Sequence, residues 1–273
     1  MTNQNLFDLS GKVAVITGAG GVLGGSMAIS LAQSGVKVAI LDLHKEAAEK
    51  RAAEILELGG EAVGLASNVL DEADLENVKN QIVDKWGTVD ILINAAGGNM
   101  AGATISPEQT IFDLSMDAFR KVSDLNLNGS VMPSLAFGKV MADKRSGIII
   151  NISSMSVAQA ITRVAGYSAS KAAIENFTRW MAVEMAQKFG EGIRVNAIAP
   201  GFFIGEQNRA LLTNPDGSYT ERGNQVIRKT PMGRFGVAEE LNGSIHFLCS
   251  QASKFITGAV IPIDGGFGAY TGV

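Results

Sequence analysis

The sequence predicts an α/β fold: a doubly wound, seven-stranded, mainly parallel sheet with helices on both faces, formed by residues 1–273 as a single domain. Two observations support this prediction. Short β-branched runs alternate with longer stretches whose apolar residues recur at helical spacing, and such alternation produces βαβ crossovers between parallel strands. No Pro-, Gly- or Ser-rich linker interrupts the alternation, so a second domain is not expected.

The β-branched runs are expected to form strands, and most stretches between them are expected to form helices. In chain order, the strands are predicted at residues 12–17, 36–42, 61–67, 89–94, 147–153, 193–198 and 259–263. The clearest helices are predicted at residues 45–58, 71–86, 116–144 and 167–189.

Two irregular stretches, residues 97–114 and 201–235, each follow a predicted strand. Structureless loops of this length are usually lids or binding loops. Open α/β sheets bind ligands outside the carboxyl ends of their strands. We therefore expect both stretches to border the substrate.

Composition narrows the class of protein. The formal charge of −4 gives no electrostatic footprint for nucleic acid, and no apolar run is long enough for a membrane span. The first ten residues do not have the pattern of a secretion signal. The single cysteine, Cys249, excludes an intrachain disulfide, and His44 and His246 are too far apart in sequence to suggest a metal site. A cytoplasmic protein without a metal site is expected.

A glycine-rich turn follows the first predicted strand and opens a helix. Glycines in such a turn let backbone amides approach a pyrophosphate at the amino end of the helix. This position in the first βαβ unit is a strong indication of a dinucleotide site. The residues expected to bind the cofactor there are Gly18, Gly21, Val22, Leu23 and Gly24.

Asp42 ends the second predicted strand, Leu43 follows it, and both are expected to bind the cofactor. A carboxylate at this place accepts hydrogen bonds from the adenosine ribose hydroxyls and repels a 2′-phosphate. The glycine-rich turn contains no Arg or Lys, and Lys45 is the nearest base after Asp42. NAD(H) is therefore expected rather than NADP(H). The alternative is that Asp42 only caps the following helix.

Three residues form the pattern that says most about function. Tyr167 and Lys171 lie four residues apart, so they share one face of the predicted helix. Ser154 lies thirteen residues before Tyr167, at the end of an apolar run that reads as a buried strand. A free phenol titrates near ~10, and a neighbouring ammonium favours its ionised form. The pattern predicts acid/base catalysis by Tyr167; the alternative is a chance pair on an amphipathic helix.

From about residue 9 to residue 268, the chain resembles the short-chain dehydrogenase/reductase family, whose fold is of the Rossmann type. The resemblance implies that Ser154 polarises the substrate carbonyl or carbinol and that Tyr167 passes the proton. It implies that Lys171 holds the nicotinamide ribose and lowers the pKa of Tyr167. Asn126 matches an asparagine that anchors a proton-relay water; it could also be a polar residue that distorts its helix through local hydrogen bonds.

The resemblance extends to further cofactor positions. Residues 68–69 stand where the family has a pair beside the adenine, residues 94–97 match a segment that supports the adenosine side, and residues 200–201 match a turn beside the nicotinamide. Gly205 replaces a threonine that often binds the carboxamide. The additional residues implied to bind cofactor are Asn68, Val69, Asn94, Ala95, Ala96, Gly97, Pro200, Gly201 and Phe203, together with Tyr167 and Lys171.

Several loop segments resemble the D-mannonate oxidoreductase (fructuronate reductase) branch of the family, whose members interconvert D-fructuronate and D-mannonate with NAD. Arg163, one helical turn before Tyr167, is expected to bind the substrate carboxylate; otherwise it is a surface arginine paired with an acid. Arg209 and Arg234 are further candidates for this contact. The residues expected to bind substrate hydroxyls are Asn99, Gln207 and Asn208.

Two alternatives remain open at this point. One is an oxidoreductase of another small polyol, ketose, gluconate-type sugar acid or 3-ketoacyl thioester. The other is a dinucleotide-sensing protein without catalysis, although such proteins typically lose the tyrosine or the lysine, and this chain has both. The resemblance also implies a homotetramer.

Overall fold

The computed structural model describes residues 5–272, except for the side chains of residues 101, 206 and 207. Its seven strands are β1 (Val13–Thr17), β2 (Lys37–Asp42), β3 (Glu61–Ala66), β4 (Ile91–Asn94), β5 (Gly147–Ile152), β6 (Ile193–Pro200) and β7 (Val260–Ile263). They form one sheet in the order β3-β2-β1-β4-β5-β6-β7, and every neighbouring pair is parallel. The predicted fold class is confirmed, and each predicted strand lies within two residues of its observed bounds.

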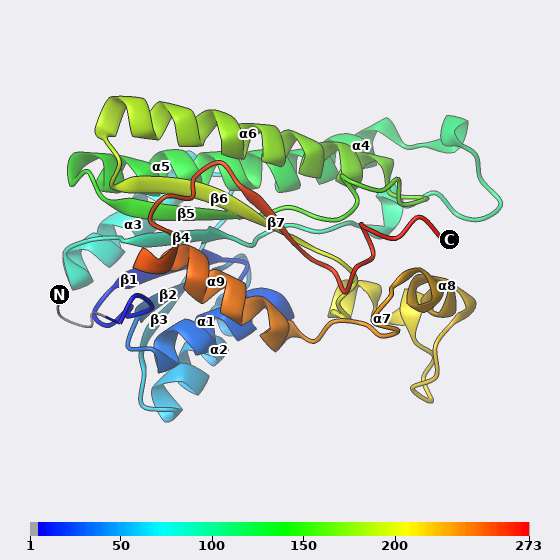
Figure 1. Ribbon diagram of the computed structural model, residues 1–273, viewed down its shortest axis with the longest axis horizontal. Coiled ribbons are helices and arrows are strands. Elements are labelled where there is room, and N and C mark those ends of the chain that lie inside the picture. Colours follow the sequence, from blue (N-terminus) through cyan, green and yellow to red (C-terminus); the bar gives the residue numbers. More distant parts are fainter. Residues whose placement is uncertain (1–4, 273) are drawn as a thin grey trace.

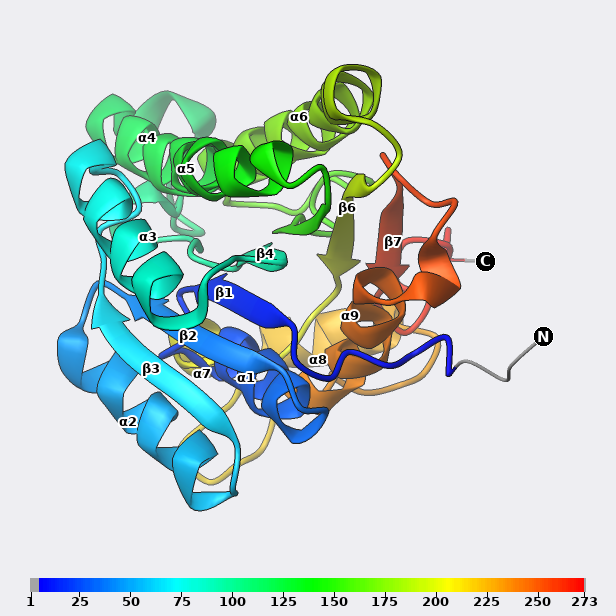
Figure 2. The same ribbon diagram turned by 90° about the vertical axis from the view of Figure 1, so that its left-hand side faces the viewer.

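Helices cover both faces of the sheet (Figures 1 and 2). One face carries α1 (Val22–Gln33), α2 (Lys45–Glu57) and α9 (Asn242–Cys249). The other carries α3 (Glu72–Trp86), α4 (Met116–Ser123), α5 (Gly129–Asp143) and α6 (Ala165–Phe189). Within residues 5–272, no helix has both the length and the apolar character that a membrane span requires.

The side chains of β1 show why its sequence is apolar without alternation. Ala14 and Ile16 pack into the core beneath α1, α2 and α9, whereas Val13 and Val15 pack into the core beneath α3, α5 and α6. Because both faces of a parallel sheet are covered, its central strands have no solvent side. The carboxyl ends of the strands are left as the accessible edge.

The predicted helix at residues 116–144 is wrong as a single helix. It is divided into α4 and α5 by the π-helical turn η3 (Asp124–Asn128), which contains Asn126. The amide Nδ2 of Asn126 donates to the carbonyl oxygen of Val122 at 2.8 Å and to that of Gly98 at 2.7 Å. The helix is therefore interrupted where one of its side chains binds a neighbouring loop, a frequent cause of π-turns at functional sites.

Residues 201–235 are also more ordered than predicted. They contain α7 (Glu206–Leu212) and α8 (Glu221–Lys229), which lie beyond the carboxyl edge of the sheet (Figure 1). Leu212, Val226 and Phe235 form a small separate core there. The other irregular stretch contains only two short 3₁₀ turns, η1 (Ala101–Ala103) and η2 (Ile111–Asp113).

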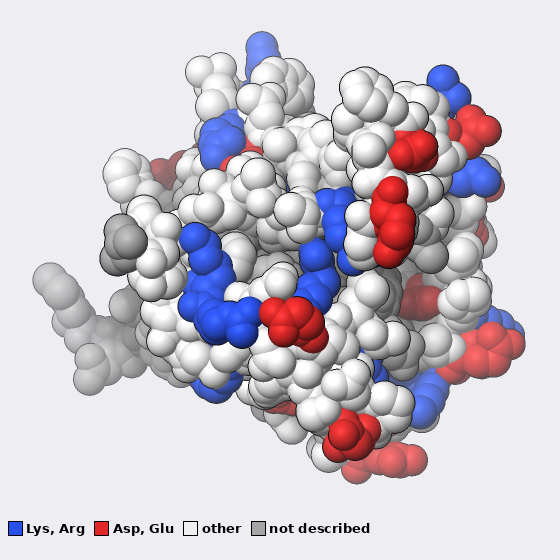
Figure 3. Space-filling view, turned by 90° about the vertical axis from the view of Figure 1, so that its right-hand side faces the viewer, with Lys and Arg blue, Asp and Glu red and all other residues white. Residues whose placement is uncertain are grey.

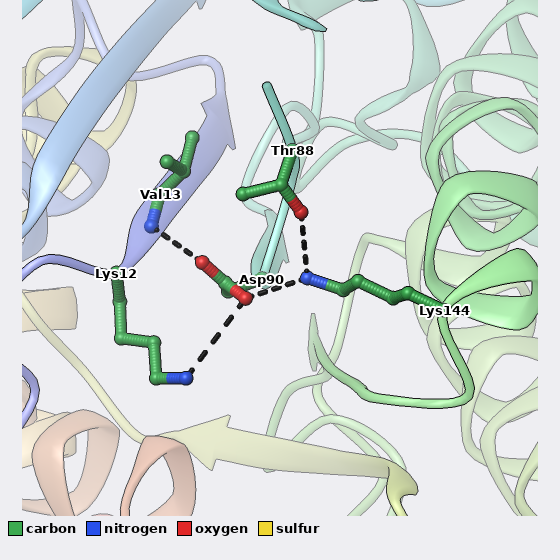
Figure 4. A network of polar contacts seen from close by, with 5 residues as sticks. All are labelled: Lys12, Val13, Thr88, Asp90 and Lys144. Atoms are coloured by element: carbon green, nitrogen blue, oxygen red, sulfur yellow. Dashed lines mark hydrogen bonds and ion pairs between the residues drawn. The ribbon is translucent and has the colours of Figure 1, made fainter. Parts of the chain in front are cut away.

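An ionic network lies at the edge of the sheet where the strands begin, opposite their carboxyl ends (Figure 4). Asp90, directly before β4, accepts hydrogen bonds from the amide of Val13 at 2.9 Å and from Nζ of Lys144 at 2.5 Å. Lys144 also donates to Oγ1 of Thr88 at 2.8 Å, and Nζ of Lys12 lies 3.9 Å from Asp90. The network joins the start of β1, the start of β4 and the end of α5, far from the functional edge.

Candidate active site

Three polar side chains meet where β5 and α6 approach each other. The Oγ of Ser154, just beyond β5, accepts a hydrogen bond from the amide of Ser156 at 3.2 Å, and its hydroxyl hydrogen-bonds to the phenol of Tyr167. Lys171 donates from Nζ to the carbonyl oxygen of Ile152 at 2.8 Å, and this nitrogen lies 5.5 Å from the centre of the Tyr167 ring. The spacing read from the sequence thus brings these three side chains together.

Burial sets the protonation of the site. It raises the pKa of the Tyr167 phenol above its ordinary value, and the hydrogen bond from Ser154 offsets this only in part. Burial also lowers the pKa of Lys171 to about 8, so the ammonium is still mostly charged at pH 7. Desolvation of the phenolate is the largest influence on the pKa of this phenol. The expected lowering of the pKa of Tyr167 by Lys171 stays a prediction. The phenol therefore holds a proton that it can donate.

Asn126 holds the loop beside these residues. Its Oδ1 accepts from the amide of Gly98 at 3.0 Å, while its Nδ2 donates to the carbonyl oxygen of the same residue. A Cβ atom on Gly97 would lie 2.8 Å from Oδ1 of Asn126 and 3.4 Å from Nζ of Lys171. The local and the functional interpretation of Asn126 are thus compatible, and the relay water stays a prediction.

A cavity of about 280 Å³ extends from Tyr167 to the glycine-rich turn. A Cβ atom on Gly18, whose φ is +64°, would lie 2.8 Å from Cα of Ala96, and one on Gly24 would lie 2.8 Å from the carbonyl oxygen of Gly18. No side chain caps the amino end of α1, so its backbone amides fit a pyrophosphate. The expected cofactor residues that line this cavity are Gly18, Gly21, Val22, Leu23, Gly24, Ala95, Gly97, Tyr167, Lys171, Pro200, Gly201 and Phe203.

Asp42 lies directly against the glycine-rich turn, outside this cavity. Its Oδ2 accepts from the amide of Gly20 at 3.1 Å, and its Oδ1 accepts from the amide of His44 at 3.0 Å. Each carboxylate oxygen can accept a second hydrogen bond, which suits a ribose diol. Asp42 is not the residue that caps α2, because His44 occupies that position. Lys45 is engaged with Glu49 at 3.5 Å.

The other expected adenosine residues lie further out or serve the framework. Leu43 and Asn68 are exposed, and Val69 is buried against α5. Asn94 is only 1% exposed and donates from Nδ2 to Ser134 and Asn151, each at 2.8 Å, so its side chain joins strands to α5 and does not line the cavity. The amides of Ala95 and Ala96 both donate to Oγ1 of Thr17 at 3.1 Å. This buried threonine was not singled out from the sequence.

A second cavity, of about 540 Å³, opens on the other side of Ser154 and Tyr167. It lies between the two stretches expected to border the substrate, at the carboxyl edge of the sheet. Figure 3 looks onto this edge and shows Lys and Arg side chains, with some Asp or Glu side chains beside them, around a hollow. Among the described residues that line the cavity there are two arginines, Arg163 and Arg222, and no Asp or Glu.

The candidate substrate residues differ in their placement. Asn99 lines the second cavity and donates from Nδ2 to Thr104 at 2.6 Å, while its buried Oδ1 has no partner within the described part of the chain. Asn208 also lines it, but its side chain is bonded to the backbone of Gly205 and Phe203, each at 2.8 Å. The side chain of Gln207 lies outside the described residues.

The other two candidate arginines lie elsewhere. Arg209 is exposed and does not line the second cavity. Arg234 binds both oxygens of Glu240, at 2.6 and 2.8 Å, and it does not line the second cavity. This bidentate pair lowers the pKa of Glu240 to about 2.

Arg163 and Arg222 come together from distant segments. Arg163 precedes α6, and its backbone is in a left-handed conformation with φ of +78°. Its Nε donates to the carbonyl oxygen of Ile105 at 2.6 Å. Arg222 lies on α8, and its nearby positive neighbour Arg163 adds to burial in lowering its pKa. No periodicity or spacing in the sequence pointed to Arg222; only the fold places it at the site.

The parallel sheet, the glycine-rich turn and the Ser154–Tyr167–Lys171 arrangement define an oxidoreductase of the dinucleotide-binding type that acts on a CH–OH group. The family model described as enoyl-(acyl carrier protein) reductase matches residues 18–268. This chain belongs to the short-chain dehydrogenase/reductase family.

Individual relatives agree with this assignment. The uncharacterized oxidoreductase UxuB of Bacillus subtilis is 46% identical, over 97% of this chain and 98% of that protein. A Haemophilus influenzae structure with bound NAD, provisionally assigned as a D-mannonate oxidoreductase, is 46% identical with a TM-score of 0.92, over 97% of this chain and 98% of that one. A gluconate 5-dehydrogenase of Burkholderia cenocepacia, in complex with NADP and tartrate, is 31% identical with a TM-score of 0.85, over 97% and 98% of the two chains.

Proposed function

We propose that the protein interconverts D-fructuronate and D-mannonate with NAD(H). The observation that carries this proposal is the charge of the second cavity. Two guanidiniums line it beside Ser154 and Tyr167, and its described lining contains no acidic side chain. An anionic substrate would supply the missing negative charge.

Unpartnered polar atoms support a polyhydroxylated substrate. Oδ1 of Asn99 and Oγ of Ser156 are both buried, both belong to residues that line the second cavity, and neither has a hydrogen-bond partner within the described chain. A buried polar group without a partner costs free energy, which a bound hydroxyl would recover once the side chain turns its oxygen into the cavity. A carboxylate at one end of the substrate and hydroxyls along it match a sugar acid.

The chemistry assigns one task to each side chain. A nicotinamide held in the first cavity, beside Tyr167 and Lys171, would supply or accept the hydride. Ser154 donates a hydrogen bond to the carbonyl oxygen of the ketone and so polarises it. Tyr167, whose phenol is protonated at neutral pH, gives its proton to that oxygen as the alcohol forms. Lys171 stabilises the resulting phenolate, and Asn126 holds the loop beside it.

The preference for NAD(H) rests on Asp42. Its carboxylate lies against the glycine-rich turn, and the nearest base, Lys45, is paired with Glu49. A 2′-phosphate would therefore meet negative charge. The Haemophilus influenzae relative was observed with NAD and the Burkholderia cenocepacia relative with NADP.

The second candidate is oxidation of a gluconate-type acid, since one relative is a gluconate 5-dehydrogenase. To separate the two candidate reactions, the rate of turnover by the purified protein is measured with NADH and with NADPH, on keto-sugar acids and on neutral ketoses. The proposal expects kcat/KM for D-fructuronate to exceed that for D-fructose by about ten- to a hundredfold, because a charge-assisted contact is worth ~1.5–3 kcal/mol. Arg163→Ala should narrow this gap, chiefly by weakening turnover of fructuronate. Activity on neutral ketoses alone would refute the proposal.

A further inference from the structure

We propose that Arg222 determines the specificity for the acid: it and Arg163 hold the substrate carboxylate between two guanidiniums, one from α8 and one from the segment before α6. This inference rests on the proposed function for the carboxylate, and it adds a residue to which the sequence did not point.

Arg163 is fixed in place by its neighbours. Its Nε donates to the carbonyl oxygen of Ile105, and its own carbonyl oxygen accepts from the amide of Ile105 at 3.0 Å. Its left-handed backbone, with φ of +78°, is one that few non-glycine residues adopt. Because Nε is used for anchoring, the two terminal nitrogens of the guanidinium remain to meet a ligand in the cavity.

Arg222 reaches the segment before α6 from another element of the fold. It lies in the first turn of α8, whose N-cap Thr220 binds the amide of Gly223 at 3.0 Å. Its guanidinium approaches Oγ1 and the carbonyl oxygen of Thr162, both at 3.4 Å. These contacts are long for hydrogen bonds, so they orient the side chain without saturating it. Thr162 directly precedes Arg163, which brings the two cations to the same wall.

The two guanidiniums repel each other, and no acidic side chain of the described residues pairs with either of them. Neither Arg163 nor Arg222 forms an ion pair within the described residues, although Arg228 on the same helix pairs with Glu221 at 2.9 Å. The half-buried Arg222 has its pKa lowered by burial first and by the charge of Arg163 second. A carboxylate between the two would remove this repulsion and would tie α8 to the segment before α6.

The test compares charged and neutral substrates in variants of the full chain. We expect Arg222→Gln to lower kcat/KM for D-fructuronate by about ten- to a hundredfold, mainly through KM, and to leave kcat/KM for D-fructose within about threefold. Arg222→Lys should fall between, because it keeps the charge but loses the planar fork. Arg228→Gln, a change of the same kind on an exposed face of α8, should behave like the wild type.

The outcomes separate this inference from the proposed function. If the wild type does not reduce D-fructuronate but oxidises D-gluconate, the proposed reaction fails, and the same comparison is made with D-gluconate and sorbitol. An equal loss by Arg222→Gln on charged and neutral substrates would show a structural role and overturn the inference. No loss on the acid, or a wild type that uses only neutral substrates, would overturn it as well.

Discussion

Tyr167 should be indispensable for the chemical step. Its phenol is buried, protonated at neutral pH and hydrogen-bonded to Ser154. Tyr167→Phe removes one hydroxyl and keeps the ring, so we expect kcat to fall by ~10²–10⁴ while fluorescence titration shows unchanged NADH binding. A variant with kcat within about threefold of the wild type would remove Tyr167 from the mechanism.

Lys171 should leave a signature in the pH dependence of stability. Burial lowers its pKa from 10.5 to about 8, so the folded protein releases this proton before the unfolded chain does. Below about pH 8, burial of the charged ammonium therefore lowers the free energy of unfolding by its full amount. As the pH rises from about 8 toward 10.5, the folded protein loses this charge and the destabilisation disappears. Relative to Lys171→Met, the free energy of unfolding of the wild type should rise over this window by on the order of 3 kcal/mol.

Denaturant unfolding of the apoprotein at several pH values measures this difference. The buried Tyr167 and Cys249 also have raised pKa values, but both proteins carry them, so their contribution largely cancels in the comparison. Parallel stability curves for the wild type and Lys171→Met would show that the pKa of Lys171 is not shifted.

At the residue scale, the sequence predicts side chains that have fixed spacing and misses those that only the fold brings together. The strand end carries Ser154, and the first turns of the next helix carry Tyr167 and Lys171. Their spacing along the chain therefore indicates that they lie close together. Arg222 lies 59 residues beyond Arg163 and on another element. Arg234 was a candidate for the carboxylate contact from its sequence position, but it forms an ion pair with Glu240, six residues on.

The end of β2 should decide between the two cofactors. Asp42 accepts two backbone amides and faces the glycine-rich turn. Asp42→Ala should raise the KM for NAD and relax the rejection of NADP, because the negative charge that would meet a 2′-phosphate is lost. Glu57→Ala at the exposed carboxyl end of α2 makes the same change of charge and should leave the ratio of the two kcat/KM values unaltered. Equal kcat/KM for NAD and NADP in the wild type would contradict this assignment.

Among the elements, strands and cofactor turns were more predictable than the segments that border the substrate. The strands are continuous apolar runs because both sheet faces are covered, and this pattern is local in sequence. The π-turn at Asn126 depends on Gly98, a residue 28 positions away, so helical periodicity alone predicts one long helix. The helices α7 and α8 are short and mostly polar, and they gain their order from the small core around Phe235.

For the whole molecule, we propose a homotetramer. The outward faces of α5 and α6 expose large apolar side chains: Leu135 is 64% exposed, Trp180 62% and Val183 56%. Apolar groups gathered on one side of a monomer usually mark an interface with another chain. Light scattering at micromolar concentration should give about four times the chain mass of 28.6 kDa, and Trp180→Glu should lower the mass of the assembly. A wild-type mass of 28.6 kDa would refute the proposal.

The reaction itself provides the most direct test of the account. Purified protein is incubated with NADH and D-fructuronate, the loss of NADH is followed by absorbance, and the sugar product is identified by NMR. We predict that one D-mannonate forms for each NADH consumed and that the reverse reaction runs with NAD and D-mannonate. A protein that binds NADH but leaves D-fructuronate unreduced, or that reduces D-fructose with comparable kcat/KM, would contradict the central claim.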